Sequence, residues 1–236
     1  LTALWNNRNF VMNKYIVSPI TRSLKILGTE ALLPIGKIYC VGKNYYDHIK
    51  EMNDSNENEL PFFFSKPPQS LTQDALIKYP NDTHNLHHEV ELVVYISNKC
   101  DDIEPKNAEK YILGYSVGID LTKRDKQNIA KEKRQPWDLS KGFDNSAPVS
   151  EIYLCSKLIK SGKIELRLNG KQRQISDISK MIWPIQEIIS NLSKQITLYP
   201  GDAIFTGTPA GVGSIEPKDN IEASIDGIGS LNISFQ

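Results

Sequence analysis

The chain has 236 residues, of which 39% are hydrophobic and 24% are charged, so its length and composition fit one ordinary globular domain with a sizeable core. Its 28 basic and 28 acidic residues cancel. Binding to nucleic acid or to an anionic membrane depends on an excess of Lys and Arg, so this balance argues against both partners. No run of about 18 apolar residues predicts a membrane-spanning helix.

The N-terminal segment and the cysteines bear on location. Residues 1–29 contain four basic and no acidic residues, a composition that organelle-targeting peptides share. We favour instead an N-terminal arm that packs on the body of a cytoplasmic protein. Cys40, Cys100 and Cys155 are widely spaced, odd in number and without a CxxC pair, which fits a reducing compartment better than a disulfide framework.

The first elements along the chain are two buried strands with a helix between them. Residues 37–42 (KIYCVG) and 90–96 (VELVVYI) are apolar runs with β-branched residues, which predict strands. Residues 45–52 (YYDHIKEM) have helical spacing. The polar run 53–59 that follows has no apolar anchor, so we expect a loop there.

Further helices are expected at two prolines. Pro105 opens a helical stretch that Gly114 closes, and residues 115–120 (YSVGID) then form a strand that ends on Asp120. Pro184 opens the clearest helix, because apolar residues follow at the spacing of one helix face: Ile185, Ile188, Ile189 and Leu192.

Short strands and turns dominate the rest of the chain. Asp226-Gly227 predicts a tight hairpin between the segments IEASI and IGSLNI. Strands outnumber helices and do not alternate with them regularly. The sequence therefore predicts a mixed α/β, mainly β, single-domain fold.

Two acidic residues in the second predicted strand form a candidate metal site. Glu89 and Glu91 lie two apart, so their side chains leave the same strand face about 6 to 7 Å apart. Because apolar residues flank them, burial would require a cation. With Asp120 they supply three oxygen ligands, which suits Mg²⁺, with Mn²⁺ or Ca²⁺ as substitutes. An exposed polar strand face is the alternative.

Three histidines directly precede this strand. His84, His87 and His88 could suggest zinc, but their spacing matches no familiar zinc pattern, and His87 and His88 point to opposite faces of an extended chain. We therefore expect hydrogen-bonded structural histidines rather than metal ligands.

Other polar residues could carry acid–base chemistry or bind an anion. His48 and Glu51 are three apart in the first predicted helix, where the carboxylate could orient the imidazole as a base. Arg124, Gln127 and Lys141 could bind a substrate carboxylate or carbonyl. A solvated helix face and ordinary surface charge are the respective alternatives.

A glycine-rich segment near the C terminus is the last candidate. GTPAGVG (residues 207–213) contains no lysine and precedes no predicted helix, so it is not a phosphate-binding P-loop. It could still present backbone N–H groups and Thr208 to an anion.

Seven segments, taken in order, resemble the fumarylacetoacetate hydrolase (FAH) family, and in particular its short acylpyruvase-type, FAH-domain-containing members. They are CVGKNYYDHIKEM, FFFSKPP, NLHHEVELVVYI, GYSVGIDLTKRD, QPWDLSKGFDNSAPVS, LRLNGKQRQ and GDAIFTGTPAGVG. The likeness runs from about Lys37 to the C terminus and predicts a catalytic domain over residues 35–236 behind an N-terminal extension, residues 1–34. Ser65 and Lys123 depart from the residue types usual in the family.

The resemblance implies a β-roll catalytic domain with a few peripheral helices, commonly a homodimer. It also implies Mg²⁺ or Mn²⁺ on Glu89, Glu91 and Asp120. A His–Glu pair of the family falls on His48 and Glu51, and its substrate-contacting residues fall on Arg124, Gln127, Lys141 and Thr208.

The expected activity is hydrolysis of the carbon–carbon bond of a 3-acylpyruvate, such as acetylpyruvate or fumarylpyruvate. Decarboxylation or keto–enol tautomerisation of oxaloacetate needs the same α-keto acid head and stays open as an alternative. A non-enzymatic module in which the metal only cross-links strands is the third possibility.

Overall fold

The computed structural model describes residue 16 and residues 20–52 and 60–236. A six-stranded sheet forms its centre, in the order β12 (Tyr153–Leu154), β9 (Ile112–Ile119), β8 (Val90–Ile96), β15 (Ala203–Phe205), β3 (Ile38–Gly42) and β4 (Phe62–Lys66). All neighbours are antiparallel except β15 and β3. A five-stranded sheet has the order β14 (Lys171–Asp177), β13 (Lys163–Leu168), β17 (Asn220–Ile225), β18 (Gly229–Phe235) and β6 (Leu76–Ile77).

Three small sheets complete the β structure. They are β1 (Ser23–Lys25) with β2 (Leu32–Pro34), β11 (Ala147–Pro148) with β5 (Leu71–Thr72), and β7 (Leu86–His88) between β10 (Thr122–Lys123) and β16 (Gly213–Ile215). The helices are α1 (Tyr46–Glu51), α2 (Arg124–Glu132), α3 (Asp138–Lys141) and α4 (Ile185–Gln195), with 3₁₀ turns η1 (Pro68–Ser70), η2 (Pro105–Tyr111) and η3 (Ile178–Lys180). Strands dominate, which confirms the mixed, mainly β fold class.

The central strands of the six-stranded sheet, β9, β8 and β15, are buried on both faces. Leu92 and Val94 point into the larger core, which the five-stranded sheet closes, whereas Val93 and Tyr95 point into a second core on the opposite face. Side chains alternate along a strand, so a strand covered on both faces is a continuous apolar run. This explains the apolar run VELVVYI. Glu89, directly before the run, and Glu91, within it, are buried acidic residues that depart from the apolar pattern.

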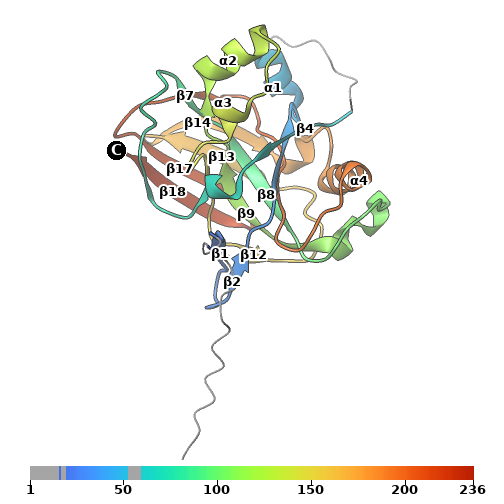
Figure 1. The fold of residues 1–236 in the computed structure, drawn as a ribbon. Helices are drawn as coiled ribbons and strands as arrows, with labels where there is room; N and C mark the ends of the chain where they lie inside the picture. Colours follow the sequence, from blue (N-terminus) through green and yellow to red (C-terminus); the bar gives the residue numbers. More distant parts are fainter. Residues whose placement is uncertain (1–15, 17–19, 53–59) are drawn as a thin grey trace, which may run out of the picture.

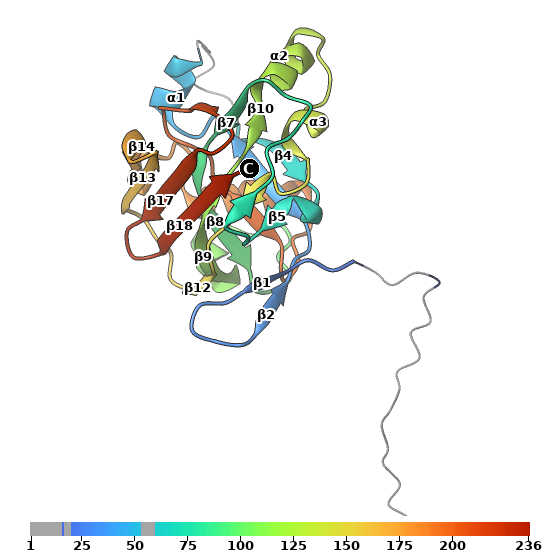
Figure 2. The same cartoon turned by 90° about the vertical axis from the view of Figure 1, so that its left-hand side faces the viewer.

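The helices occupy the surface. Helices α1, α2 and α3 gather at one end of the molecule in both views (Figures 1 and 2). Helix α4 buries its predicted apolar face and packs on η2. Among the described residues, no helix is both long and apolar enough to cross a membrane.

The predicted elements around residues 37–52, 90–96 and 184–195 are confirmed, as is the hairpin at Asp226-Gly227, where Gly227 has a φ of 74°. The helical stretch expected from Pro105 to Gly114 begins at Pro105 as predicted, but its predicted end is wrong: it is a 3₁₀ helix that ends at Tyr111, and β9 begins at Ile112. Gly114 lies inside β9, where a Cβ would lie 2.4 Å from the Tyr153 carbonyl oxygen. Its role is close strand approach and not helix termination.

The N-terminal residues are described in part. In residues 20–34, β1 and β2 form a hairpin whose Leu24 is buried in the second core. Residues 1–15 and 17–19 of the predicted arm, and the predicted loop 53–59, lie outside the described residues.

Candidate metal centre and active site

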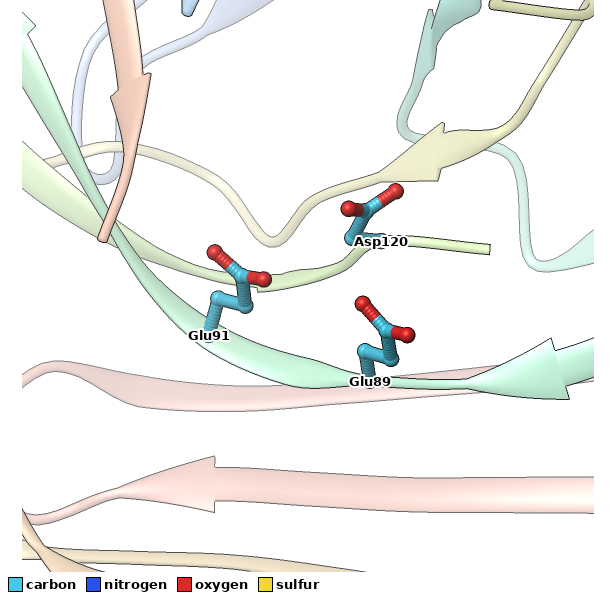
Figure 3. Close-up of side chains that lie close together, drawn as sticks. All are labelled: Glu89, Glu91 and Asp120. Carbon is cyan, nitrogen blue, oxygen red and sulfur yellow. The ribbon is translucent and has the colours of Figure 1, made fainter. Parts of the chain in front are cut away.

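Three carboxylates meet where two central strands end. Glu89 directly precedes β8, Glu91 lies within it, and Asp120 directly follows the antiparallel neighbour β9. The Asp120 amide donates to the Glu89 carbonyl oxygen at 2.8 Å, which fixes the two chain segments side by side. One oxygen from each carboxylate lies within 4.8 Å of the others, and Figure 3 shows the three side chains turned toward one shared space.

Buried cations surround two of these carboxylates. The Lys141 ammonium lies 2.8 Å from Glu89 Oε2 and 2.7 Å from Asp120 Oδ2, and Arg124 pairs with Glu89. Burial alone would raise the pKa of Glu89, but Lys141 and Arg124 outweigh it and hold that pKa below its usual range. Burial likewise would lower the pKa of Lys141, yet Asp120 and Glu89 raise it.

Glu91 is in a different position. It is 2% exposed and accepts a hydrogen bond from the Gly207 amide at 2.7 Å. Burial, and then repulsion by Asp120 and Glu89, raise the pKa of Glu91 well above its ordinary value. A divalent cation between the three groups would let all three ionise, and an all-oxygen set suits Mg²⁺, Mn²⁺ or Ca²⁺. The residues present therefore fit a hard divalent ion.

The predicted His–Glu pair is formed on α1. His48 Nδ1 lies 3.1 Å from Glu51 Oε2, and His48 is 8% exposed. The Gly211 amide donates to both Glu51 oxygens, at 3.0 and 3.2 Å, and so anchors the carboxylate. Because an ionised carboxylate only accepts hydrogen bonds, it selects the tautomer with a proton on Nδ1 and leaves Nε2 as the proton acceptor.

Helix α2 brings two polar side chains beside this centre. Arg124 and Gln127 are one helical turn apart, both are buried, and Arg124 Nη1 donates to Gln127 Oε1 at 2.6 Å. Arg124 also contacts Glu89, so the guanidinium joins the helix to the carboxylate cluster.

The glycine-rich segment after β15 presents backbone N–H groups to acidic side chains. Its amides at Gly207 and Gly211 donate to carboxyl oxygens of Glu91 and Glu51, which belong to the protein itself. Thr208, in the same segment, is 3% exposed and lies beside the three carboxylates in the lining of a small cavity. The segment therefore holds two site carboxylates in place.

A small cavity of about 70 Å³ joins these groups. Eight of the nine predicted site residues line it, and the ninth, Glu51, bonds to His48: the eight are His48, Glu89, Glu91, Asp120, Arg124, Gln127, Lys141 and Thr208. The fold thus brings together residues that are far apart in the sequence, such as Glu51 and Gly211, which are 160 positions apart.

Two buried residues of this region were missed from the sequence. Lys66, with a fully buried side chain, pairs with Asp120 Oδ1 at 2.7 Å and donates to carbonyl oxygens of Ser146 and Leu121 at 3.0 and 3.4 Å, and to that of Lys141. Its place in the FFFSKPP segment was visible, but nothing local indicated that the ammonium is buried.

Gln174 is the second missed residue. Its Oε1 accepts from the Val90 amide at 3.1 Å and bonds to His88 Nδ1 at 2.9 Å, while its Nε2 donates to Thr208 Oγ1 and to the Pro209 carbonyl, both at 2.8 Å. One amide thus connects the strand of the two glutamates with the segment that carries Thr208.

The histidines upstream of β8 make other contacts. His88 bonds to Gln174, and His87 lies 3.4 Å from Arg124 Nε. Burial, followed by the nearby Arg124, lowers the pKa of His87 to about 4. The three-carboxylate cluster contains no histidine.

The sequence that forms this site is similar to those of known proteins. Residues 37–236 match the family model described as fumarylacetoacetate (FAA) hydrolase, C-terminal. The chain belongs to the fumarylacetoacetate hydrolase family. This match covers the six-stranded and five-stranded sheets and every predicted site residue, and it confirms the family resemblance drawn from the sequence.

Relatives within the family carry names with different activities. The human protein named oxaloacetate tautomerase FAHD1, mitochondrial, is 41% identical over 202 residues, which are 84% of this chain and 91% of that protein. A Dictyostelium discoideum protein named oxaloacetate decarboxylase, mitochondrial, is 39% identical over 196 residues, 81% of this chain and 89% of that protein.

A solved structure gives the same picture of the fold. Fumarylpyruvate hydrolase from Pseudomonas aeruginosa, in complex with Mn²⁺ and pyruvate, superposes with a TM-score of 0.89 at 39% identity and covers 94% of this chain and 98% of its own. The FAH-type fold of this chain is therefore established.

Proposed function

We propose that this protein is a divalent-metal-dependent enzyme that hydrolyses the carbon–carbon bond of a 3-acylpyruvate. The products are pyruvate and the carboxylic acid of the acyl group. The observation that carries the proposal is the convergence of a three-carboxylate cluster and a carboxylate-oriented histidine on one small cavity. The relative described with Mn²⁺ and pyruvate supports it.

Glu89, Glu91 and Asp120 are the proposed ligands of Mg²⁺ or Mn²⁺. When bound, the ion supplies a Lewis acid for the α-keto acid head of the substrate. The residues fit this role because their three charges are too close to ionise together without added positive charge, as the raised pKa of Glu91 indicates.

His48 is the proposed general base. Glu51 holds its Nδ1 proton, so Nε2 can take a proton from a water molecule that attacks the distal carbonyl of the acylpyruvate. The bond between that carbonyl carbon and C3 then breaks, its electron pair forms the enolate of pyruvate, and a proton on C3 completes the product.

Cationic and polar side chains are proposed to hold the head group. Lys141 faces the developing enolate oxygen with a full positive charge, which favours the transition state over the ground state. Arg124 and Gln127 orient the substrate from α2, and Thr208 offers its hydroxyl hydrogen, since its oxygen already accepts from Gln174.

Oxaloacetate is the competing substrate, because the names of two relatives specify its tautomerisation or decarboxylation. It has the same α-keto acid head, and neither reaction needs a water nucleophile. A purely structural metal module is disfavoured, since a base and four further predicted site residues, Arg124, Gln127, Lys141 and Thr208, line the cavity beside the carboxylates.

The deciding experiment compares pyruvate release from acetylpyruvate, fumarylpyruvate and oxaloacetate with Mg²⁺ or Mn²⁺ and matched enzyme. We expect hydrolysis of an acylpyruvate to be fastest. His48→Ala should reduce it by about 10²- to 10⁴-fold while oxaloacetate decarboxylation persists. Full acylpyruvate hydrolysis in this variant would remove the base from the mechanism, and activity on oxaloacetate alone would refute the proposed reaction.

A further inference from the structure

A buried histidine that the proposed mechanism does not use lies directly before Glu89. His88 belongs to β7, the central strand of the three-stranded sheet, and is 0% exposed. Its Nδ1 lies 2.9 Å from Gln174 Oε1, and its Nε2 has no hydrogen-bond partner among the described residues. In the ladder it pairs with Gly213, where a Cβ would lie 3.5 Å from Nε2. The one polar contact of this imidazole is therefore with Gln174.

Two backbone groups fix the orientation of the Gln174 amide. The Val90 amide can only donate and lies 3.1 Å from Oε1, whereas the Pro209 carbonyl can only accept and lies 2.8 Å from Nε2. The reversed amide would bring two donors together at Val90 and two acceptors together at Pro209. Because Oε1 only accepts, His88 Nδ1 must carry a proton and donate it to that oxygen.

The same amide determines what the Thr208 hydroxyl can do. Gln174 Nε2 donates one hydrogen to the Pro209 carbonyl and the other to Thr208 Oγ1, each at 2.8 Å. This side of the amide offers no acceptor, so the Thr208 hydroxyl hydrogen cannot bond back to it. Across the described part of the chain, Thr208 donates no hydrogen bond to the protein, and it lines the cavity beside the three carboxylates. Its hydrogen is therefore available to a ligand in that cavity.

We propose that His88 and Gln174 are positioning residues that make the Thr208 hydroxyl a hydrogen donor to the ligand, and so select an acceptor, such as an ionised carboxylate oxygen, at that point. Neither residue lines the cavity, so both act through Thr208 and not by contact with the ligand. The donors from His88 and Val90 hold Oε1 together, and loss of the imidazole leaves only one of them. The inference rests on the proposed function for the presence of an α-keto acid beside Thr208.

The test measures oxalate binding to the Mn²⁺-loaded protein by calorimetric titration, because the oxalate dianion offers only acceptors. Thr208→Val should weaken oxalate binding about tenfold, the scale of one charge-assisted hydrogen bond. His88→Leu and His88→Met both lack the donor, and each should weaken it about threefold or more, since a misoriented hydroxyl loses part of that bond. Two such variants are used so that the failure of one to fold leaves the other, and thermal unfolding establishes which are folded.

A conservative variant and a control separate positioning from packing. His88→Asn should retain the wild-type oxalate affinity, because its amide nitrogen is as many bonds from Cα as the histidine Nδ1 and can donate to the same oxygen. His84→Leu is the matched control, because His84 is an exposed histidine of the same segment, and it should also bind oxalate as the wild type does. The Mn²⁺ affinity, titrated separately, should be equal in all variants, which distinguishes an effect through Thr208 from one through the neighbouring Glu89.

A double-mutant cycle identifies the path of the effect. In a Thr208→Val background, His88→Leu and His88→Met should cause no further loss of oxalate affinity, because the hydroxyl that His88 helps to orient is absent. Wild-type affinity in the folded His88 variants, losses that add to that of Thr208→Val, or an equal loss in His88→Asn would overturn the proposal.

These outcomes are independent of turnover. A protein in which His88 and Thr208 are coupled in oxalate binding, but which releases no pyruvate from any acylpyruvate, retains the positioning role and refutes the proposed reaction. Pyruvate release from an acylpyruvate without this coupling retains the reaction and refutes the positioning role.

Discussion

Two aspartates of this protein each form ion pairs with two lysines. One aspartate is buried and the other is exposed to solvent. Asp120 lies between Lys66 and Lys141, at 2.7 Å from each ammonium, and its side chain and that of Lys66 are fully buried. Asp82 lies between Lys123, at 2.7 Å, and Lys126, but its side chain is 54% exposed.

Because one cluster is buried and the other is not, their ion pairs contribute differently to stability. Water reaches Asp82 and Lys126 and screens their charges, so their contact contributes little to stability, although the Lys123 side chain is 7% exposed. Around Asp120 the charges have lost their hydration, so each depends on its partners and the removal of one leaves an uncompensated buried charge. The buried cluster is therefore the one that can hold a reactive centre in a fixed geometry.

Removal of the buried lysine should have the largest effect. Lys66→Met leaves Asp120 with one cation and removes an ammonium donor from the carbonyl oxygens of Ser146 and Leu121, of which that of Ser146 keeps the Leu121 amide as a donor. We expect the free energy of unfolding to fall by about 3–5 kcal/mol, measured by urea denaturation. Weaker Mn²⁺ binding, measured by calorimetry on the folded variant, should accompany it.

The matched control is Lys126→Met, which removes a lysine from the exposed cluster. It should change the free energy of unfolding by less than about 1 kcal/mol and leave Mn²⁺ binding unaltered. Equal losses in the two variants would show that burial does not distinguish the clusters.

A buried neutral contact should give an intermediate effect. Gln174→Met leaves the Val90 amide and the Pro209 carbonyl unpaired, at a cost of about 1–3 kcal/mol for a buried group. It should also weaken the binding of oxalate, a mimic of the pyruvate enolate, because the Thr208 hydroxyl loses its fixed orientation. Gln172→Met, on the exposed side of the same strand, should change neither quantity.

A double-mutant cycle separates positioning from stability. If Gln174 acts through Thr208, then Gln174→Met should barely reduce oxalate affinity in a Thr208→Val background. Additive losses of oxalate affinity would restrict Gln174 to a structural role.

The exposed cluster should give the smallest effect and a defined pH dependence. Hydrogen bonds from Lys123 and then Lys126 lower the pKa of Asp82 to about 2 from an ordinary 3.8. A lowered pKa means that the ionised group stabilises the fold above about pH 4, and that this contribution disappears as the pH falls through about 2.

Asp82→Asn should therefore lower the free energy of unfolding by less than about 1 kcal/mol at pH 7, since the Asp82 side chain is 54% exposed and solvent screens its charge. Urea midpoints of wild type and variant should converge as the pH falls below 4. A difference that widens toward low pH would contradict this assignment.

The sequence predicted two of the three clustered carboxylates from local information, whereas Asp120 comes from a separate segment of the chain. Glu89 and Glu91 share a strand face by spacing alone, and the apolar run around them indicated burial. Lys66 and Gln174 could not be found in this way, because their partners lie 34 to 86 residues away along the chain and their polar neighbours resemble surface segments.

The main error in the predicted secondary structure is the end of the helical stretch that begins at Pro105. Proline followed by glycine nine residues later is compatible with a helix, but a 3₁₀ turn and a strand that needs glycine for close packing satisfy the same pattern. The homodimer that the family resemblance implies stays a prediction, which light scattering can measure.

Metal-dependent pyruvate release from an acylpyruvate tests the central claim most directly. Chelator-treated protein should release no pyruvate, and Mg²⁺ or Mn²⁺ should restore release in the wild type but not in Glu91→Gln, which loses one ligand charge. Undiminished pyruvate release by the chelator-treated protein would contradict the account of the three carboxylates.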